Sequence, residues 1–143
     1  MIAAVVFNIL VIGLVVVIHY EALRYISRML TRLRLPGRLP VLVSVPAVLA
    51  AHALEVWVFA LSYHLQLRHF AMGELVGADG TFLDCVYFSF VTYTSLGIGD
   101  MYPVGDIRYH AGLEALVGLV MIGWTASFLY VEMERYWQDN DTG

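Results

Sequence analysis

The sequence predicts an all-α integral membrane protein with three transmembrane helices and a shorter helix that enters the bilayer without crossing it. Of its 143 residues 60% are hydrophobic, and the mean hydropathy is +0.74, values that place it among membrane proteins. Three apolar segments approach or exceed the roughly 20 residues that a helix needs to cross a bilayer, namely residues 1–20, 41–67 and 109–131. A shorter apolar run, residues 82–94, precedes a Gly-x-Gly-Asp unit.

Residues 21–40 are predicted to form a basic cytoplasmic linker after the N-terminal transmembrane helix. The sequence contains no lysine, and five of its eight arginines fall within this stretch. Because positive charge beside a span favours the cytoplasmic side, three spans place the N-terminus outside and the C-terminus in the cytoplasm. Arg24, Arg28 and Arg32 recur every four residues on one helix face, where we expect contact with anionic lipid headgroups rather than voltage sensing. Residues 34–38 are expected to form the turn.

The second segment, residues 41–67, carries two ionisable residues one helical turn apart, His52 and Glu55. Ionisable side chains at membrane depth usually face protein rather than lipid. One interpretation is a metal ion shared by the imidazole and the carboxylate. The favoured interpretation is that Glu55 is protonated, or hydrogen-bonded to a hydroxyl group near the short helix.

The short helix is expected to dip into the bilayer from outside. Thr81 and Asp84 have the spacing of a capping box, which predicts the helix start. Residues 82–94 are too few to cross the bilayer, so the chain must turn back at their end. The pair Gly97 and Gly99 follows at once. Glycine readily adopts the left-handed backbone conformations that other residues avoid.

The run Ser95-Leu96-Gly97-Ile98-Gly99, followed by Asp100, resembles the TVGYG selectivity filter of potassium channels. In such a filter, rings of backbone carbonyl oxygens replace the water shell of the ion, and alternate residues must adopt conformations that a Cβ makes costly. The resemblance implies K⁺ sites at residues 95–98 and a hydroxyl ring from Ser95. It also implies that Leu96 and Ile98 pack behind the filter. No other cofactor is expected.

Residues 41–137 resemble the small prokaryotic potassium channels of the two-transmembrane, pore-loop family, with the first helix as an addition. The resemblance implies an outer helix at about 41–67, a pore helix at about 82–94, a filter at 95–99 and an inner helix at about 109–131. Residues 138–143 are expected to be a polar tail. Because one chain carries one filter segment, the resemblance implies a homotetramer. It implies passive conduction of K⁺ rather than an enzyme, with membrane lipids and no nucleic acid as partners.

Further roles are implied for the inner helix. Glu114 is expected near the back of the filter, and Gly118 and Gly123 are expected to allow close helix approach or bending near the gate. Glu132 and Glu134 are expected to place acidic rings at the inner mouth, where they would concentrate cations.

The sequence departs from the family pattern around the filter, where Ile98 replaces the usual Tyr or Phe. Phe88 is expected to face Ile98, which makes an apolar contact without direction. Val91 stands where some members carry a Glu, so Asp100 is expected to bond Tyr87 instead. Thr94 completes the set of supporting residues. These departures predict a filter that is held in place mostly by packing. Such a filter is expected to be more pliable than filters with the family's consensus sequence.

Two alternatives to a potassium-selective channel stay open. The first is a cation channel of the same architecture with weak or no selectivity, because selectivity depends on how the carbonyl groups are held. The second is an intramembrane metal-binding protein that uses His52 and Glu55. The sequence shows no compact ligand pattern, nucleophile motif or phosphate loop that would favour an enzyme.

Overall fold

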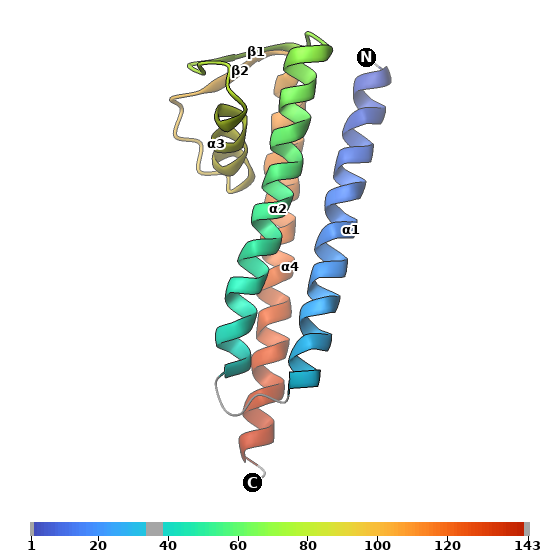
Figure 1. Cartoon of the computed structure of the whole chain (residues 1–143), viewed down its shortest axis with the longest axis vertical. Coiled ribbons are helices and arrows are strands. Elements are labelled where there is room, and N and C mark those ends of the chain that lie inside the picture. Colours follow the sequence, from blue (N-terminus) through green and yellow to red (C-terminus); the bar gives the residue numbers. More distant parts are fainter. Residues whose placement is uncertain (1, 34–38, 142–143) are drawn as a thin grey trace.

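A computed structural model describes residues 2–33 and 39–141, and the side chains of residues 4–33 and 39–135. Three long helices lie side by side, and a short helix and a small sheet lie against one end of this group (Figure 1). The elements in order are α1 (Ile2–Leu33), α2 (Leu39–His69), β1 (Gly73–Val76), α3 (Phe82–Tyr93), β2 (Tyr102–Gly105) and α4 (Ile107–Asp141). The turn predicted at residues 34–38 lies outside the described residues.

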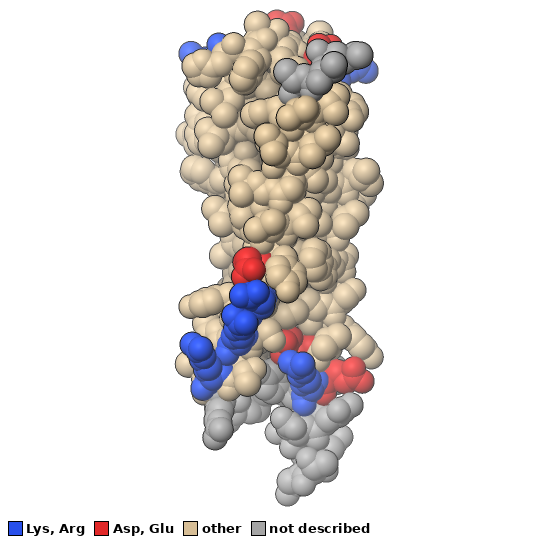
Figure 2. Space-filling model, turned by 90° about the vertical axis from the view of Figure 1, so that its right-hand side faces the viewer, with Lys and Arg blue, Asp and Glu red and all other residues tan. Residues whose placement is uncertain are grey.

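The three predicted spans are confirmed as helices. The segments Ala4–Leu33, Leu39–His69 and Ile107–Arg135 are each long and apolar enough to cross a bilayer. Large apolar side chains are exposed along all three, which suits a surface that faces lipid or other membrane-embedded protein. Figure 2 shows that the charged side chains of one face gather near its two ends, with a broad uncharged zone between them.

Residues 21–33 of the predicted linker at residues 21–40 are a continuation of the first helix, because α1 runs without a break to Leu33. The reason is a second apolar pattern that runs alongside the arginines. Leu23, Ile26 and Leu30 recur at helical spacing and are buried in a cluster with Val48 of α2. This packing favours continued helix, and it leaves the arginines on the exposed side.

Helices α2 and α4 are also longer than the sequence predicted. Helix α2 begins at Leu39 and ends at His69, and α4 begins at Ile107. At its C-terminal end α4 runs to Asp141, so residues 138–141 belong to a helix rather than to a polar tail. The short helix α3 matches its prediction within one residue.

A two-stranded antiparallel sheet, which the sequence did not predict, joins the segments before and after α3. It pairs β1 with β2, and Gly73 lies opposite Gly105. A Cβ on Gly73 would lie 2.0 Å from the backbone oxygen of Val104, so the close pairing requires glycine there. The sheet thereby holds together the two ends of the loop that carries α3.

The capping box at the start of α3 is confirmed. The Thr81 hydroxyl accepts a hydrogen bond from the Asp84 amide at 3.2 Å, and the Asp84 carboxylate accepts one from the Thr81 amide at 2.8 Å. Two backbone donors that the helix itself cannot satisfy therefore find partners. The box fixes where the chain turns into α3.

The capping box predicts a pH-dependent stability. The hydrogen bond from the Thr81 amide holds the pKa of Asp84 below its ordinary value. The unfolded chain therefore binds this proton more readily, so the contribution is present above an unfolded pKa of about 3.9 and is lost as the pH falls through the folded pKa. Thermal unfolding in detergent between about pH 6 and pH 3 should show wild type losing stability faster than Asp84→Asn.

Asp79 provides the control for this measurement, because its exposed side chain precedes the capping box without forming it. The variant Asp79→Asn should follow the wild-type curve over the acidic range. If Asp84→Asn instead loses stability in parallel with wild type, the capping carboxylate does not contribute in this way.

Candidate pore loop and its supporting networks

The candidate site is the pore loop, defined as α3 and the residues 94–100 that follow it. Helix α3 packs against α2 and α4. Phe88 contacts Tyr63 of α2 with ring centroids 5.1 Å apart, and the Ser89 hydroxyl oxygen lies 2.9 Å from the Val56 carbonyl oxygen of α2. These contacts hold the short helix against the longer ones.

Gly118 allows α4 to approach the C-terminal end of α3. A Cβ on Gly118 would lie 2.0 Å from the backbone oxygen of Tyr93 and 2.8 Å from its carbonyl carbon. The close approach of α4 expected from the sequence is therefore present at Gly118. At Gly123, in contrast, a Cβ would meet no described atom within 4 Å.

The filter backbone, residues 95–99, alternates in conformation. Ser95, Gly97 and Gly99 have φ values of 57°, 55° and 86°, all in the left-handed region. Sequence reasoning identified the two glycines but not Ser95, whose Cβ makes this conformation cost roughly 1–2 kcal/mol. An alternation of this kind turns successive carbonyl groups toward one side of the chain, as a carbonyl-lined ion path requires.

Hydrogen bonds to the end of α3 hold the strained start of the filter. The Ser95 amide donates to the Thr92 carbonyl at 2.9 Å, and the Leu96 amide donates to the Val91 carbonyl at 3.0 Å. The Thr94 hydroxyl donates to the Phe90 carbonyl at 2.7 Å. Val91 thus supports the filter through its backbone, while its side chain is buried.

The contact expected between Phe88 and Ile98 is not formed within one chain. Phe88 lies on the face of α3 turned toward α2, where Tyr63 covers it, and it is only 6% exposed. Ile98 is 57% exposed and Leu96 is 66% exposed, so neither packs behind its own filter. Both filter side chains are therefore mostly uncovered within one chain.

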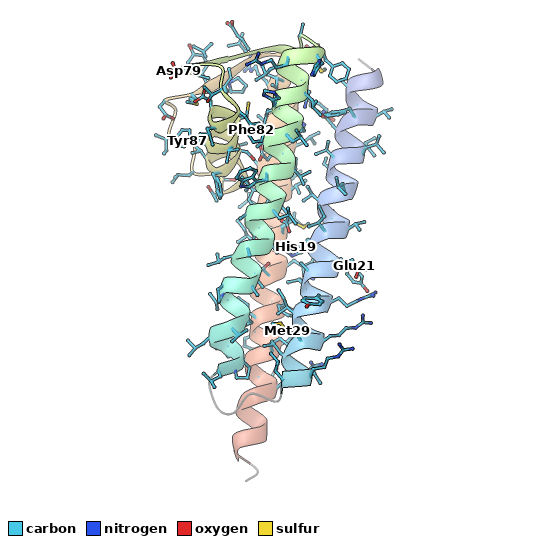
Figure 3. All side chains as sticks on the ribbon, viewed as in Figure 1. His19, Glu21, Met29, Asp79, Phe82 and Tyr87 are labelled. Atoms are coloured by element: carbon cyan, nitrogen blue, oxygen red, sulfur yellow. The ribbon has the colours of Figure 1, made fainter. Side chains whose placement is uncertain are left out.

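The expected bond between Tyr87 and Asp100 is present. The Tyr87 hydroxyl donates to the Asp100 carboxylate at 2.8 Å, and the other carboxylate oxygen accepts from the Met101 amide at 3.0 Å. This hydrogen bond raises the pKa of Tyr87 above its ordinary value. Tyr87 lies on the side of α3 away from α2 (Figure 3), so the bond links the pore helix to the outer end of the filter.

Removing the Tyr87 hydroxyl should weaken the outer end of the filter. Tyr87→Phe deletes the bond to Asp100 but keeps the ring, and a hydrogen bond to a carboxylate contributes about 1.5–3 kcal/mol at most, less at this exposed position. We expect open events in single-channel recordings to shorten. Tyr102→Phe in β2, also exposed, is the matched control and should leave them unchanged. Equal open durations in wild type and Tyr87→Phe would contradict this role.

Behind the pore helix, Glu114 of α4 is fully buried. Its carboxylate accepts hydrogen bonds from the Tyr63 hydroxyl of α2 and the Ser89 hydroxyl of α3, each at 2.5 Å. One carboxylate thus links three helices at the back of α3, where the sequence placed it. The partners Tyr63 and Ser89 were not identified from the sequence.

A second buried network lies at the C-terminal end of α3. Glu55 of α2 accepts from the Tyr93 hydroxyl of α3 and bonds His19 Nδ1 of α1 at 2.8 Å. His52 Nδ1 lies 2.9 Å from the same Tyr93 hydroxyl, and His52 Nε2 lies 2.9 Å from Thr125 Oγ1 of α4. Glu55 thus bonds a hydroxyl of the pore helix, as favoured from the sequence, within a network of four helices.

The first helix has a further polar link. Asn8 of α1, buried, bonds His110 Nδ1 of α4 at 2.8 Å, and His110 Nε2 lies 2.5 Å from the Ser62 hydroxyl of α2. Sequence reasoning missed both histidine networks because each depends on partners more than thirty residues apart. The available signal was the occurrence of Asn8 and His19 in an otherwise apolar segment.

The inner end differs from its prediction at one acidic residue. Glu132 is 5% exposed, and its carboxylate accepts from the Ser27 hydroxyl of α1 at 2.7 Å. A side chain enclosed within its own chain cannot line a path formed by several chains, so the acidic ring expected at Glu132 is wrong. Glu134 is exposed.

The three linker arginines lie exposed on α1. Arg24 pairs with Glu21 at 3.3 Å, and Figure 2 shows the positive side chains in a row near one end of the molecule. Their position beside the uncharged zone fits a face at the level of lipid headgroups.

Comparison with known proteins identifies the family. Residues 51–135, which include the second half of α2, the pore loop and most of α4, match the family model described as ion channel. The chain belongs to this family. Membership indicates a multi-pass membrane channel rather than an enzyme, and it supports a tetrameric pore architecture.

A curated relative agrees with this family. The chain is 31% identical over 72 residues to the inward rectifier potassium channel Kirbac3.1 of Paramagnetospirillum magnetotacticum. The match covers 48% of this chain and 24% of the relative, so the chain spans about a quarter of that protein's length. No solved structure is significantly similar to the chain. Helix α1 lies outside the family match.

Proposed function

We propose that the chain is the subunit of a homotetrameric, potassium-selective channel that conducts K⁺ passively through the backbone carbonyl groups of residues 95–99. The observation that carries this proposal is the left-handed conformation at Ser95, Gly97 and Gly99. Three left-handed residues, each separated by one residue, give the alternation that a carbonyl-lined path needs. The K⁺ sites would lie at the carbonyl groups of residues 95–98.

The exposed filter side chains support a tetramer. Leu96 and Ile98 are apolar and mostly exposed in a single chain, and they lie beside a backbone with little packing of its own. Four copies around one axis would cover these side chains and bring four filter strands together. The proposal also places the pore loop at the outer face, which puts the N-terminus outside and the C-terminus in the cytoplasm. Anionic lipid would then contact the arginine face of α1 from the cytoplasmic side.

Cation flux through the purified protein in liposomes tests the proposal. Potassium flux should exceed sodium flux strongly, and Ba²⁺, whose size is close to that of K⁺, should block it. Gly97→Ala provides the matched filter variant, because its φ of 55° disfavours a Cβ even though no described atom lies within 4 Å. Gly13→Ala on α1, also with open space, is the control. Equal flux in wild type and Gly97→Ala would overturn the filter assignment.

A weakly selective channel of the same build is the second candidate, and Ile98 favours it. Its side chain has no hydroxyl and is 57% exposed, and Phe88, the brace expected from the sequence, packs against Tyr63 instead. Ile98→Tyr should therefore raise the permeability ratio of K⁺ over Na⁺ and lengthen open events. Reversal potentials in mixed-ion solutions measure the ratio. If the ratio and the open durations both stay unchanged, the filter is not limited by its bracing.

A further inference from the structure

We propose that His19, His52 and Glu55 form a binding site for a divalent transition metal of the Zn²⁺ class. The site joins α1 to α2 at the C-terminal end of α3. These three residues can each offer one ligand atom, and the three atoms lie within 4.8 Å of one another. The site is separate from the filter and from the conduction of K⁺. It goes beyond the channel function proposed above.

The spacing of the donor atoms suits a small metal ion. His19 Nδ1 lies 2.8 Å from one Glu55 oxygen, and His52 Nδ1 lies 3.4 Å from the other. In a tetrahedral zinc site with bonds of about 2.0–2.1 Å, neighbouring ligand atoms are about 3.3 Å apart. The donor atoms lie within 4.8 Å of one another, so the widest pair has to close by about 1.5 Å at most to reach this arrangement.

Both imidazole rings are oriented as they are around bound metals. His52 Nε2 lies 2.9 Å from Thr125 Oγ1, and His19 Nε2 lies 3.4 Å from the same oxygen. The indole ring of Trp124 also packs against the His19 ring, with centroids 5.2 Å apart. Metal-binding histidines commonly use one nitrogen for the metal and the other for a fixed polar partner. Here one threonine holds both rings, so that both Nδ1 atoms turn toward Glu55.

Tyr93 supplies a fourth donor atom, and its negative charge as a phenolate would make the metal-bound site neutral overall. Its hydroxyl bonds Glu55 and lies 2.9 Å from His52 Nδ1, so its oxygen lies next to two of the three ligands. A divalent ion bound by the Glu55 carboxylate, two neutral imidazoles and the Tyr93 phenolate carries no net charge, provided that Tyr93 releases its hydroxyl proton to solvent when the ion binds. Neutrality matters because a buried, unpaired charge is costly. Side-chain donors of this kind, two nitrogens and two oxygens, suit Zn²⁺ and Co²⁺ better than K⁺.

Cobalt titration of the tag-free protein in detergent tests the proposal. Four-coordinate Co²⁺ absorbs visible light, so a bound ion reports its own geometry. We expect absorption that saturates at one Co²⁺ per chain and is displaced by Zn²⁺. His19→Gln and His52→Gln should each weaken binding at least 100-fold. Thr125→Val keeps all the ligands and should weaken it about 10- to 100-fold, as loss of an orienting partner does.

His64→Gln is the matched control, since His64 lies on the same helix as His52 but packs against Phe82. It should leave the titration unchanged. A second readout is the thermal unfolding midpoint, which Zn²⁺ should raise in wild type and in His64→Gln but not in His52→Gln. Wild-type protein that gives no saturable visible absorption overturns the proposal. So does a titration that survives in both histidine variants, because the ion would then sit elsewhere.

Discussion

Gly118→Ala is expected to destabilise the subunit by about 2–3 kcal/mol and to reduce K⁺ flux strongly. In an ordinary helix this change stabilises, because alanine is the better helix former by about 1 kcal/mol. Here the new Cβ would lie 2.0 Å from the Tyr93 backbone oxygen. A backbone carbonyl cannot rotate away as a side chain can, so α4 must move away from the end of α3. The filter begins two residues after Tyr93, so it would move as well.

Gly123→Ala separates this clash from a general effect of glycine replacement. It lies on the same helix, and its Cβ would meet no described atom within 4 Å. The free energy of unfolding in detergent, measured by SDS titration, should fall for Gly118→Ala and stay level or rise for Gly123→Ala. Similar values for the two variants would show that α4 does not need the close approach.

Glu114→Ala is expected to lower the free energy of unfolding by about 2–5 kcal/mol. The change leaves a cavity and removes the carboxylate that accepts the hydrogen bond from the Tyr63 hydroxyl. Glu114 and Tyr63 are both fully buried, so no bulk water replaces this acceptor. Ser89 keeps an acceptor, because its single hydroxyl proton can turn to the Val56 carbonyl oxygen, 2.9 Å away. The loss therefore falls mainly on the link between α2 and α4. The same SDS titration measures it.

Glu134→Ala is the matched control, as an exposed carboxylate on the same helix. Its free energy of unfolding should change by less than about 0.5 kcal/mol. Glu114→Gln should fall between wild type and Glu114→Ala, since it keeps the volume and one acceptor oxygen but places an amide donor against a second hydroxyl donor. A Glu114→Ala protein as stable as Glu134→Ala would show that the network does not hold the helices.

Features that depend on neighbouring residues could be predicted from the sequence. The capping box at Thr81 needs only residues three apart, and the bond between Tyr87 and Asp100 follows from the way the chain folds back after α3. Gly97 indicated the filter from the sequence alone, because glycine adopts a left-handed conformation whatever its neighbours are. Such local rules predicted the bounds of α3 well.

Features that depend on distant partners could not be predicted in the same way. The arginines indicated a helix face within a linker at residues 21–40, but they did not show that packing of Ile26 against α2 makes this stretch a continuation of α1. The resemblance placed Glu132 at the inner mouth, and its buried position was missed because its partner, Ser27, lies 105 residues away. Phe88 and Tyr87 are neighbours on α3, and the sequence did not show which of them turns toward α2.

The polar side chains of α1 have a consequence for the order of assembly. Asn8 and His19 are eleven residues apart, about three helical turns, so they project from one face of α1. Their partners, His110 and Glu55, lie on α4 and α2. A slip of one turn, about 5.4 Å, would break both bonds. Both partners are synthesised after α1, so α1 can take its final position only once α2 and α4 have entered the bilayer.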